Sequence, residues 1–184
     1  ADQSNNRVRA VDLATGVICT VAGAGTAVYN GDEVAATETG LAGPSGLALG
    51  SDGTLFIADS FNGRIRAVDP VTGLIRTVVG DGGEYRYQGP EEPPSSSLSR
   101  PSGITLDEEG NLYVTDSDNH LVRRWDRFTG RIERIAGVGV ADYGGDGGAA
   151  LEAALSYPFG IVMDHAGHLL VADTFNHRIR EIAQ

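Results

Sequence analysis

The sequence repeats itself with an unchanging period of 57 residues. A motif of Ala or Thr, Asp, two variable residues and Asn occurs four times, with its aspartates at Asp2, Asp59, Asp116 and Asp173. Thr-Gly and Pro-x-Gly motifs keep the same spacing, so neither insertion nor deletion separates the units. A long, constant period is the signature of a repeat architecture, in which each unit buries its apolar face against its neighbours.

The period also sets the domain organisation. The 184 residues divide into units 1–57, 58–114 and 115–171, followed by a partial fourth unit, 172–184, that matches the first 13 residues. We therefore expect a single repeat region over residues 1–184, assembled from units of one kind.

Four short apolar runs within each period predict strands. One set of runs covers 46–49, 54–58, 64–68 and 74–79. The runs contain β-branched and aromatic residues or alternate polar with apolar ones, and clusters of Asp, Asn, Gly and Pro separate them as turns. The 26 glycines of the chain fit such a turn-rich fold. A four-stranded antiparallel meander repeated around an axis is the blade of a β-propeller, so we predict an all-β propeller fold.

The units resemble the NHL repeat. The resemblance rests on Asp-x-x-Asn-x-Arg-Ile-Arg followed by Asp, Thr-Gly, a (Val/Ile)-(Ala/Val)-Gly string and Pro-x-Gly, and it covers essentially the whole chain. The Asn-His pair of the family name is present at Asn176 and His177. The resemblance implies propellers that are commonly six-bladed and mostly work as binding platforms, with some related six-bladed propellers acting as metal-assisted hydrolases or lyases.

The number of strands does not close a ring. With the strands of a blade labelled A to D from the centre outward, the chain reads C, D, then two full sets of A to D, then A, B and C. Propellers close with about four to eight blades, so about three blades per chain leave open, aggregation-prone strand edges. We expect two copies to associate as a homodimer of six blades, in which the first C strand (7–11) and the last (178–182) compete for one position. The alternative is a fragment of a longer repeat array with no independent function.

A candidate binding face follows from the connections between blades. In this meander the B–C turns and the D-to-A connections emerge on one face, and the connections 23–43, 80–100 and 137–157 are about twenty residues long, against a usual 4–6. Short helical turns are expected at 35–38 and 149–153. A protein, peptide, glycan or cationic ligand would bind there, and the same residues could instead serve to fold their loops. The candidate ligand-binding residues are Tyr29, Asp32, Arg86, Tyr87, Tyr143 and Asp146.

Two further repeated motifs are interpreted as structural. Calcium needs six to eight oxygens around one ion, whereas equivalent positions of successive blades lie apart, so Asp59, Asp116 and Asp173 are expected to form B–C turns rather than a metal site. Each of them is followed by Asn three residues later. The Arg-x-Arg pairs near Asp12 and Asp69 are expected to form ion pairs between blades.

No catalytic signature stands out. The serine run 95–97 lacks a nucleophile elbow, Cys19 occupies an outward-facing strand position, and no glycine-rich loop opens a helix as a phosphate site would. Repeats so alike also offer few of the unlike groups that an active site brings together. We therefore expect a non-catalytic binding scaffold without a cofactor or metal. The alternative is a calcium-assisted hydrolase or lyase.

Charge narrows the partners further. The chain carries 14 basic residues, all arginine, against 25 acidic ones, which gives a net charge of −11. A surface this negative repels phosphate backbones and anionic lipid, so neither nucleic acid nor membrane is expected as a partner. A single cysteine excludes an internal disulfide and leaves the compartment unknown, with a bacterial extracellular or periplasmic location as a working hypothesis.

Overall fold

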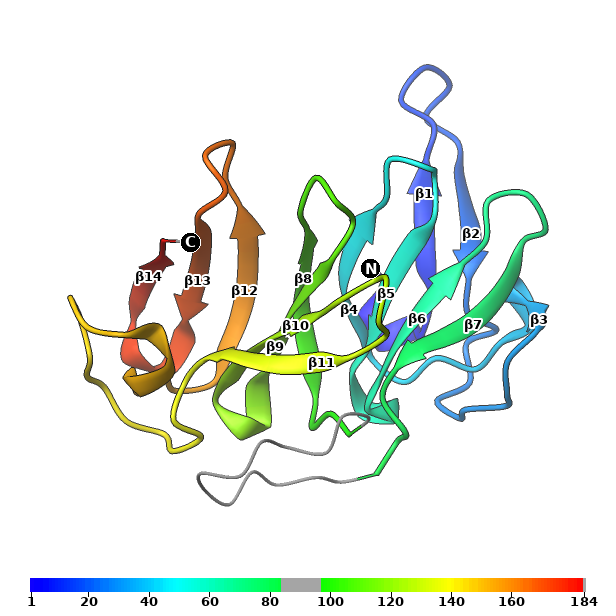
Figure 1. The fold of residues 1–184 in the computed structure, drawn as a ribbon. Coiled ribbons are helices and arrows are strands. Elements are labelled where there is room, and N and C mark those ends of the chain that lie inside the picture. The colour runs from blue at the N-terminus through cyan, green and yellow to red at the C-terminus, as the bar shows by residue number, and fades with distance from the viewer. Residues whose placement is uncertain (84–96, 184) are drawn as a thin grey trace.

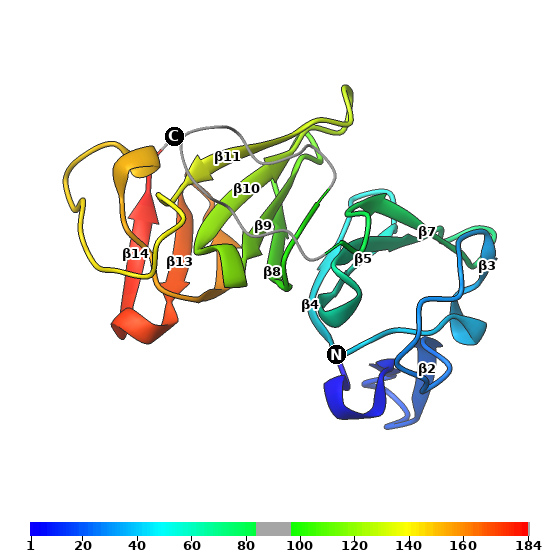
Figure 2. The same cartoon turned by 90° about the horizontal axis from the view of Figure 1, so that it is seen from below.

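The computed structural model describes residues 1–83 and 97–183, and these residues form four antiparallel sheets. The sheets stand side by side along an open arc, which Figure 1 shows from the side and Figure 2 from below. Each sheet runs outward from the inside of the arc, as blades do in a propeller.

The bounds of the strands are as follows. The first sheet contains β1 (Val8–Val11) and β2 (Ile18–Ala22). The second contains β4 (Pro44–Leu49), β5 (Leu55–Asp59), β6 (Arg64–Val68) and β7 (Leu74–Val79), with β3 (Val34–Ala35) added outside β7. The third contains β8 (Pro101–Leu106), β9 (Leu112–Asp116), β10 (Leu121–Trp125) and β11 (Ile132–Ala136). The fourth contains β12 (Pro158–Met163), β13 (Leu169–Asp173) and β14 (Arg178–Ile182).

The described residues also contain six 3-10 turns, one before β1 and five between strands. They are η1 (Gln3–Asn5), η2 (Ala36–Glu38), η3 (Ser60–Asn62), η4 (Ser117–Asn119), η5 (Ala150–Glu152) and η6 (Thr174–Asn176). The helical turns expected at 35–38 and 149–153 are therefore confirmed as η2 and η5.

The predicted order of strands is confirmed, with one addition. The sheets contain C and D, then two full A-to-D sets, then A, B and C. The added strand is β3, in which Val34 pairs with Ile75 of β7. It comes from a long connection whose path depends on tertiary contacts, so the apolar pattern did not reveal it.

The innermost strand β8 packs against β4 on one side and against β12 on the other, and glycine makes this approach feasible. A Cβ atom on Gly46 would overlap the main-chain oxygen of Ser102, and one on Gly103 would overlap that of Phe159. The Pro-x-Gly motif therefore sets the spacing between neighbouring blades.

The hydrophobic core lies between the sheets. Ile65 and Val79 of the second sheet pack with Ile104 and Leu112 of the third. Trp125 packs against the same cluster. Each sheet is thus stabilised chiefly by its neighbour, which explains why the repeat period is so regular.

The B–C turns contain the predicted Asp–Asn pair. In the second sheet, the buried Asp59 accepts hydrogen bonds from the main-chain N–H of Ala42 (2.7 Å) and from Asn62 (2.9 Å). Arg66 lies 3.6 Å from the same carboxylate. Of the other three aspartates of the motif, Asp116 and Asp173 have the same three kinds of partner.

The prediction of ion pairs between blades is wrong for the second arginine of the Arg-x-Arg motif. Arg66 and Asp59 belong to adjacent strands of one sheet, so their ion pair is internal to a blade. Asp69 instead accepts hydrogen bonds from the N–H groups of Val71 and Thr72, and Asp12 holds its own turn in the same manner. A carboxylate that closes an Asp-x-x-Thr-Gly turn has its oxygens directed at that turn.

The two ends of the arc differ from its middle. The outer edge of β14 pairs with no strand among residues 1–83 and 97–183, whereas its counterparts β6 and β10 pair with β7 and β11.

Within the same described residues, no helix is long and apolar enough to cross a membrane.

Candidate functional site

The B–C turns and the described parts of the D-to-A connections share one end of the molecule, as the sequence predicted (Figure 1). The turns η3, η4 and η6 and the described parts of the D-to-A connections lie together at the lower end in Figure 1. The sequence placed its candidate residues on this face.

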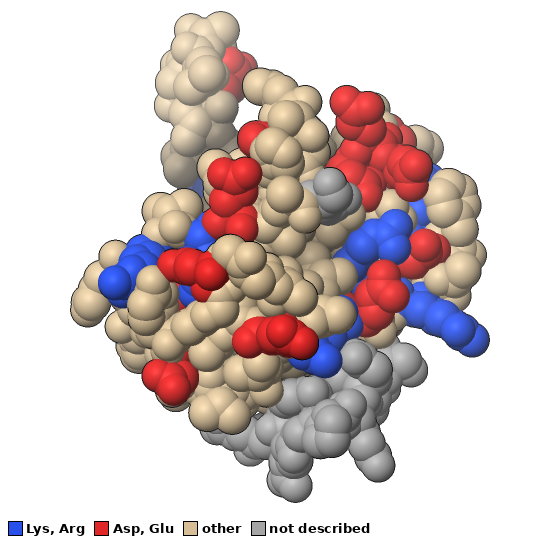
Figure 3. All heavy atoms as spheres, turned by 60° about the vertical axis from the view of Figure 1, so that its left-hand side comes forward, with Lys and Arg blue, Asp and Glu red and all other residues tan. Residues whose placement is uncertain are grey.

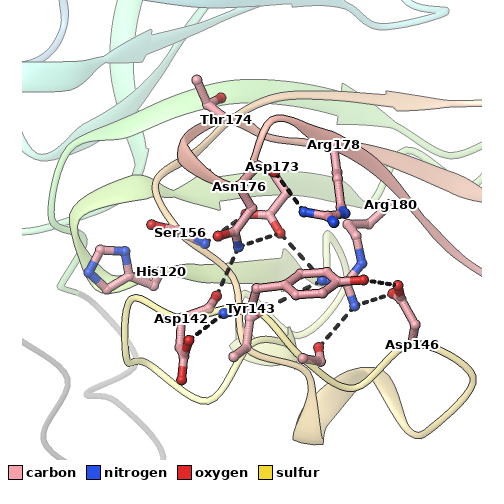
Figure 4. A network of polar contacts seen from close by, with 12 residues as sticks. His120, Asp142, Tyr143, Asp146, Ser156, Asp173, Thr174, Asn176, Arg178 and Arg180 are labelled. Atoms are coloured by element: carbon pink, nitrogen blue, oxygen red, sulfur yellow. Dashed lines mark hydrogen bonds and ion pairs between the residues drawn. The ribbon is translucent and has the colours of Figure 1, made fainter.

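Tyr143 and Asp146 hold the connection 137–157 against β14, as Figure 4 shows. The guanidinium carbon of Arg178 lies 3.9 Å from the centre of the Tyr143 ring. The Tyr143 hydroxyl donates a hydrogen bond to Asp146 (2.7 Å), and Asp146 forms an ion pair with Arg180 at 2.6 Å. Arg180 also lies 3.3 Å from the buried Asp173. The five side chains form one network that fixes the loop to the strand.

The electrostatics of this network follow from its hydrogen bonds. The hydrogen bond from Tyr143 lowers the pKa of the Asp146 carboxyl, and the same bond raises the pKa of the Tyr143 hydroxyl. Both side chains are exposed. At neutral pH the pair therefore consists of a carboxylate and a neutral phenol.

Tyr29 and Asp32 repeat this device on the second sheet. The Tyr29 ring lies 3.9 Å from the guanidinium carbon of Arg64. Asp32 forms an ion pair with Arg66 at 3.0 Å and accepts a hydrogen bond from Thr77.

The structure does not bring the two tyrosine–aspartate pairs together. One pair packs on the second sheet and the other on the fourth, with the third sheet between them. Arg86 and Tyr87, the candidates of the middle connection, lie outside the described residues. Each described pair thus serves its own blade and remains partly open to solvent.

A second group of side chains lies nearer the inside of the arc, and the sequence analysis missed it. We call it the inner-rim cluster, and it contains Phe61, Arg100, Asp118, Tyr157, Phe159 and Phe175. The cluster spans three sheets, because its members come from the ends of the innermost strands and from the B–C turns.

Aromatic contacts run through the inner-rim cluster. Phe175 lies 4.8 Å from Tyr157 and 6.2 Å from Phe159, measured between ring centres. The Arg100 guanidinium carbon is 5.0 Å from the Phe159 ring and 5.7 Å from the Phe61 ring. Phe61 and Phe175 are 66% and 58% exposed, which is unusual for phenylalanine and marks a surface available for contact.

A pocket of about 580 Å³ opens beside this cluster. Arg100, Phe159 and the inner strands line it together with three serines, of which Ser60 and Ser102 are buried. The Ser45 and Ser60 hydroxyl oxygens are 2.7 Å apart, and Ser102 donates a hydrogen bond to the main-chain oxygen of Arg100. The pocket thus combines apolar walls with a few polar groups, as ligand sites commonly do.

The repeats themselves contain a signal that could have revealed the cluster. The residue before Pro-x-Gly is Gly43, Arg100 or Tyr157 in successive units. The middle residue of that motif changes from Ser45 and Ser102 to Phe159. The third position of the Asp-x-x-Asn motif is likewise Ser4, Phe61, Asp118 or Phe175. These positions change while the framework around them is repeated.

Backbone strain accompanies two of these differences between units, at Arg100 and at Tyr157. The position before Pro has a φ of 58° at Gly43, 56° at Arg100 and 47° at Tyr157. Glycine adopts this left-handed conformation freely, whereas other residues pay about 1 kcal/mol. Strain retained at positions that are partly open to solvent is a pointer to function.

The opposite face has a wider groove of about 1160 Å³, lined by the A–B turns and by Arg124, Arg127 and Asp107 among others. Arg124 of β10 is paired with Glu133, whereas Asp107 and Arg127 form hydrogen bonds with the main chain of an A–B turn, which they help to fold. Figure 3 shows acidic and arginine side chains interspersed over the side of the molecule that carries the fourth sheet. Neither surface gathers groups of one chemistry as the inner rim does.

The comparisons with known proteins agree with the repeat pattern. The model of the NHL repeat matches residues 98–125. The chain is 38% identical over 152 residues to Protein SUPPRESSOR OF QUENCHING 1, chloroplastic, of Arabidopsis thaliana. The aligned region covers 78% of this chain and 14% of that protein. It is 33% identical over 161 residues to NHL repeat-containing protein 2 of Bos taurus, covering 78% and 21% respectively. The chain therefore spans less than a quarter of either relative.

Solved structures show the same fold. A protein of unknown function from Bacteroides thetaiotaomicron aligns over 97% of this chain and 42% of its own length, with a TM-score of 0.74 and 23% identity. An auxiliary nutrient binding protein from Bacteroides ovatus aligns over 100% and 44%, with a TM-score of 0.67 and 20% identity. At such identities the likeness establishes the architecture of the sheets and leaves the function to be argued from the site.

Proposed function

This chain belongs to the NHL-repeat family, and from that premise we propose that it is a non-catalytic binding scaffold whose ligand lies on the face of the B–C turns and D-to-A connections. One observation carries the proposal. The Asp–Asn–Arg framework is the same in every blade, whereas the inner-rim positions change to Phe61, Arg100, Tyr157, Phe159 and Phe175. A surface that diverges on a repeated framework, and that exposes aromatic rings, is what ligand recognition requires.

Binding is favoured over catalysis by the chemistry of the same pocket. A hydroxyl nucleophile needs a base within hydrogen-bond reach. The partner of the Ser60 hydroxyl is the Ser45 hydroxyl, and the partner of the Ser102 hydroxyl is a main-chain oxygen. The groups facing the pocket are therefore suited to contact and orientation.

Substitution at the inner rim tests this function. The labelled protein would be applied to glycan and peptide arrays beside a variant with Phe61→Ser and Phe175→Ser, which introduces the residue found at Ser4. Phe128→Ser is the matched control, since Phe128 is 78% exposed on a distant turn. We expect the double variant to lose the ligands that the protein and the control retain. Equal loss in the control, or no ligand for any form, would refute the proposal.

We also propose that the chain associates with a second copy to complete its blades. The support is the open outer edge of β14, whose counterparts in the second and third sheets are both paired. The same edge would be filled if further repeats followed in a longer array. Light scattering during size exclusion separates the two cases, because a mass near twice 19.2 kDa requires association and a monomer excludes it.

A further inference from the structure

The guanidinium of Arg100 is the cation of the inner-rim pocket. Its side chain is 36% exposed and lies against the Phe159 ring at 5.0 Å. A guanidinium that stacks on an aromatic face keeps its N–H edges free to bind in its own plane. Within residues 1–83 and 97–183, its polar contact is the ion pair with Asp118 at 3.5 Å.

That ion pair leaves capacity for another acceptor. A separation of 3.5 Å is long for a charge-assisted hydrogen bond, which normally measures 2.7–2.9 Å. The Asp118 oxygen involved is buried and makes no hydrogen bond in the described part of the chain. A partly exposed pair of this kind contributes little to stability. A carboxylate approaching the open edge of Arg100 would therefore find several unused donors.

Phenylalanine rings lie near Arg100, beside the serines and glycines that also line the pocket. Phe61 and Phe175 expose most of their rings, and Phe159 forms a wall of the pocket. Aromatic rings bind other rings through edge-to-face and offset contacts that add to the burial of apolar area. The pocket volume of about 580 Å³ accommodates a single ring with a short side arm.

We propose that the inner-rim pocket binds a carboxylate carried on a short arm from an aromatic ring, with Arg100 receiving the carboxylate and Phe159, at the pocket wall, receiving the ring. The inference rests on the proposed binding function and names its ligand class. Asp118 acts as an internal counterion that the ligand displaces. The net charge of −11 repels anions, but at physiological ionic strength salt largely screens this repulsion beyond a distance of about 8 Å.

Three probes of similar size and shape test the charge requirement. Phenylacetate, phenylacetamide and phenethylamine share the ring and differ in their polar group. Titration followed by two-dimensional NMR should show binding of phenylacetate with shifts at Arg100, Phe159 and Phe175, at least tenfold tighter than of either other probe. Equal binding of the neutral amide would overturn the proposal.

The role of Arg100 can be tested with a substitution that is expected to leave the fold intact. Arg100→Gly restores the residue found at Gly43, which adopts the same φ without strain. We expect Arg100→Gly to unfold at an equal or higher temperature and to bind phenylacetate at least tenfold more weakly. Asp118→Asn should instead strengthen phenylacetate binding by roughly threefold, because the competing charge is removed. Unchanged binding in Arg100→Gly contradicts the role assigned to the arginine.

The carboxylate could belong to a small acid or to the carboxyl terminus of a protein, and a peptide probe distinguishes the two. Gly-Gly-Phe with a free carboxyl terminus presents the same chemistry as phenylacetate, and its amidated form lacks the charge. Tighter binding of the free peptide identifies a protein terminus as the ligand, and tighter binding of phenylacetate identifies a small acid. If neither binds while an array ligand is lost on Phe61→Ser and Phe175→Ser, the ligand class is wrong and the binding function stands.

Discussion

Arg123 and Asp116 lie 3.5 Å apart with both side chains completely buried, on neighbouring strands of one blade. The Asp116 carboxylate also accepts hydrogen bonds from the Ser99 N–H and from Asn119. Arg123 donates to the main-chain oxygen of Ser97, at the end of the connection that precedes the sheet. One buried pair thus ties the B–C turn, the C strand and the incoming chain to a single point.

Removing one member of this pair should be costly. Asp116→Ala leaves the guanidinium buried without its counterion, and we expect a loss of about 3–5 kcal/mol in the free energy of unfolding. Urea denaturation measures it. Asp69→Ala is the control, because Asp69 closes an exposed turn and its loss should change stability much less. If the two substitutions lowered the free energy of unfolding equally, the burial of the Asp116–Arg123 pair would not explain the loss.

The same aspartate should make stability depend on pH. Burial raises the pKa of Asp116 to about 6, against an ordinary value of 3.8. Between these two values the folded chain binds the proton more tightly than the unfolded chain, so stability from this group increases as pH falls and is lost as pH rises through about 6. The difference in unfolding free energy between the protein and Asp116→Asn should therefore favour the protein increasingly from pH 7 to pH 4. A carboxyl titration of Asp116 by NMR with its midpoint at or below the ordinary value would contradict this.

Local chemistry explains why the framework could be predicted from the sequence. Asp59 and Asn62 interact within one turn, and the strands beside them alternate or carry β-branched residues, so their signals lie within a few residues. The packing of Tyr29 on Arg64 could not be read in this way, because the two residues belong to different elements that tertiary contacts bring together. The inner-rim cluster was not predicted, because Phe61 and Phe159 lie where the units differ and no repeated motif marks them.

Spacing between blades should be intolerant of a single methyl group at Gly46. A Cβ atom there overlaps the carbonyl oxygen of Ser102 on the next inner strand, so Gly46→Ala must push two blades apart, at a cost of about 2–3 kcal/mol. Gly73→Ala is the matched control, since its φ is +70° but its Cβ meets open space, and only about 1 kcal/mol of backbone strain is expected. Thermal or urea unfolding of both variants would reveal the difference. Equal losses would mean that the inner strands can adjust.

The role of Tyr143 can be separated into its two contacts. Tyr143→Phe keeps the stacking on Arg178 and removes the hydrogen bond to Asp146, whereas Tyr143→Ala removes both. Hydrogen exchange in residues 137–157 should become slightly faster in the first variant and considerably faster in the second, because the loop then keeps the Asp146–Arg180 ion pair but loses the packing of the ring on Arg178. Unchanged exchange in Tyr143→Ala would indicate that the ring serves a ligand rather than the loop.

The proposed association makes a specific statement about register. The same position of the C strand pairs with the same position of the D strand in three blades. The pairs are Ala10↔Cys19, Ala67↔Arg76 and Arg124↔Glu133. Glu181 is the equivalent C-strand residue of β14, whose outer edge is open. If β2 of a second copy fills that edge in the register of the other blades, its Cys19 must lie opposite Glu181.

Glu181→Cys converts this register into a covalent test. Residues directly opposite in an antiparallel pair have Cα atoms about 4.5–5.5 Å apart, which is within the range for a disulfide. Cys19 is exposed and is the one cysteine of the sequence. Mild oxidation with oxidised glutathione should therefore convert Glu181→Cys into covalent dimers or longer chains on a non-reducing gel, and additional Cys19→Ser should abolish them. Glu152→Cys, on the exposed turn η5, is the control for random collision. Since β1 must leave β2 for this pairing to form, a truncation that removes residues 1–11 should speed the cross-linking, and a rate no greater than that of the control would exclude strand exchange in this register.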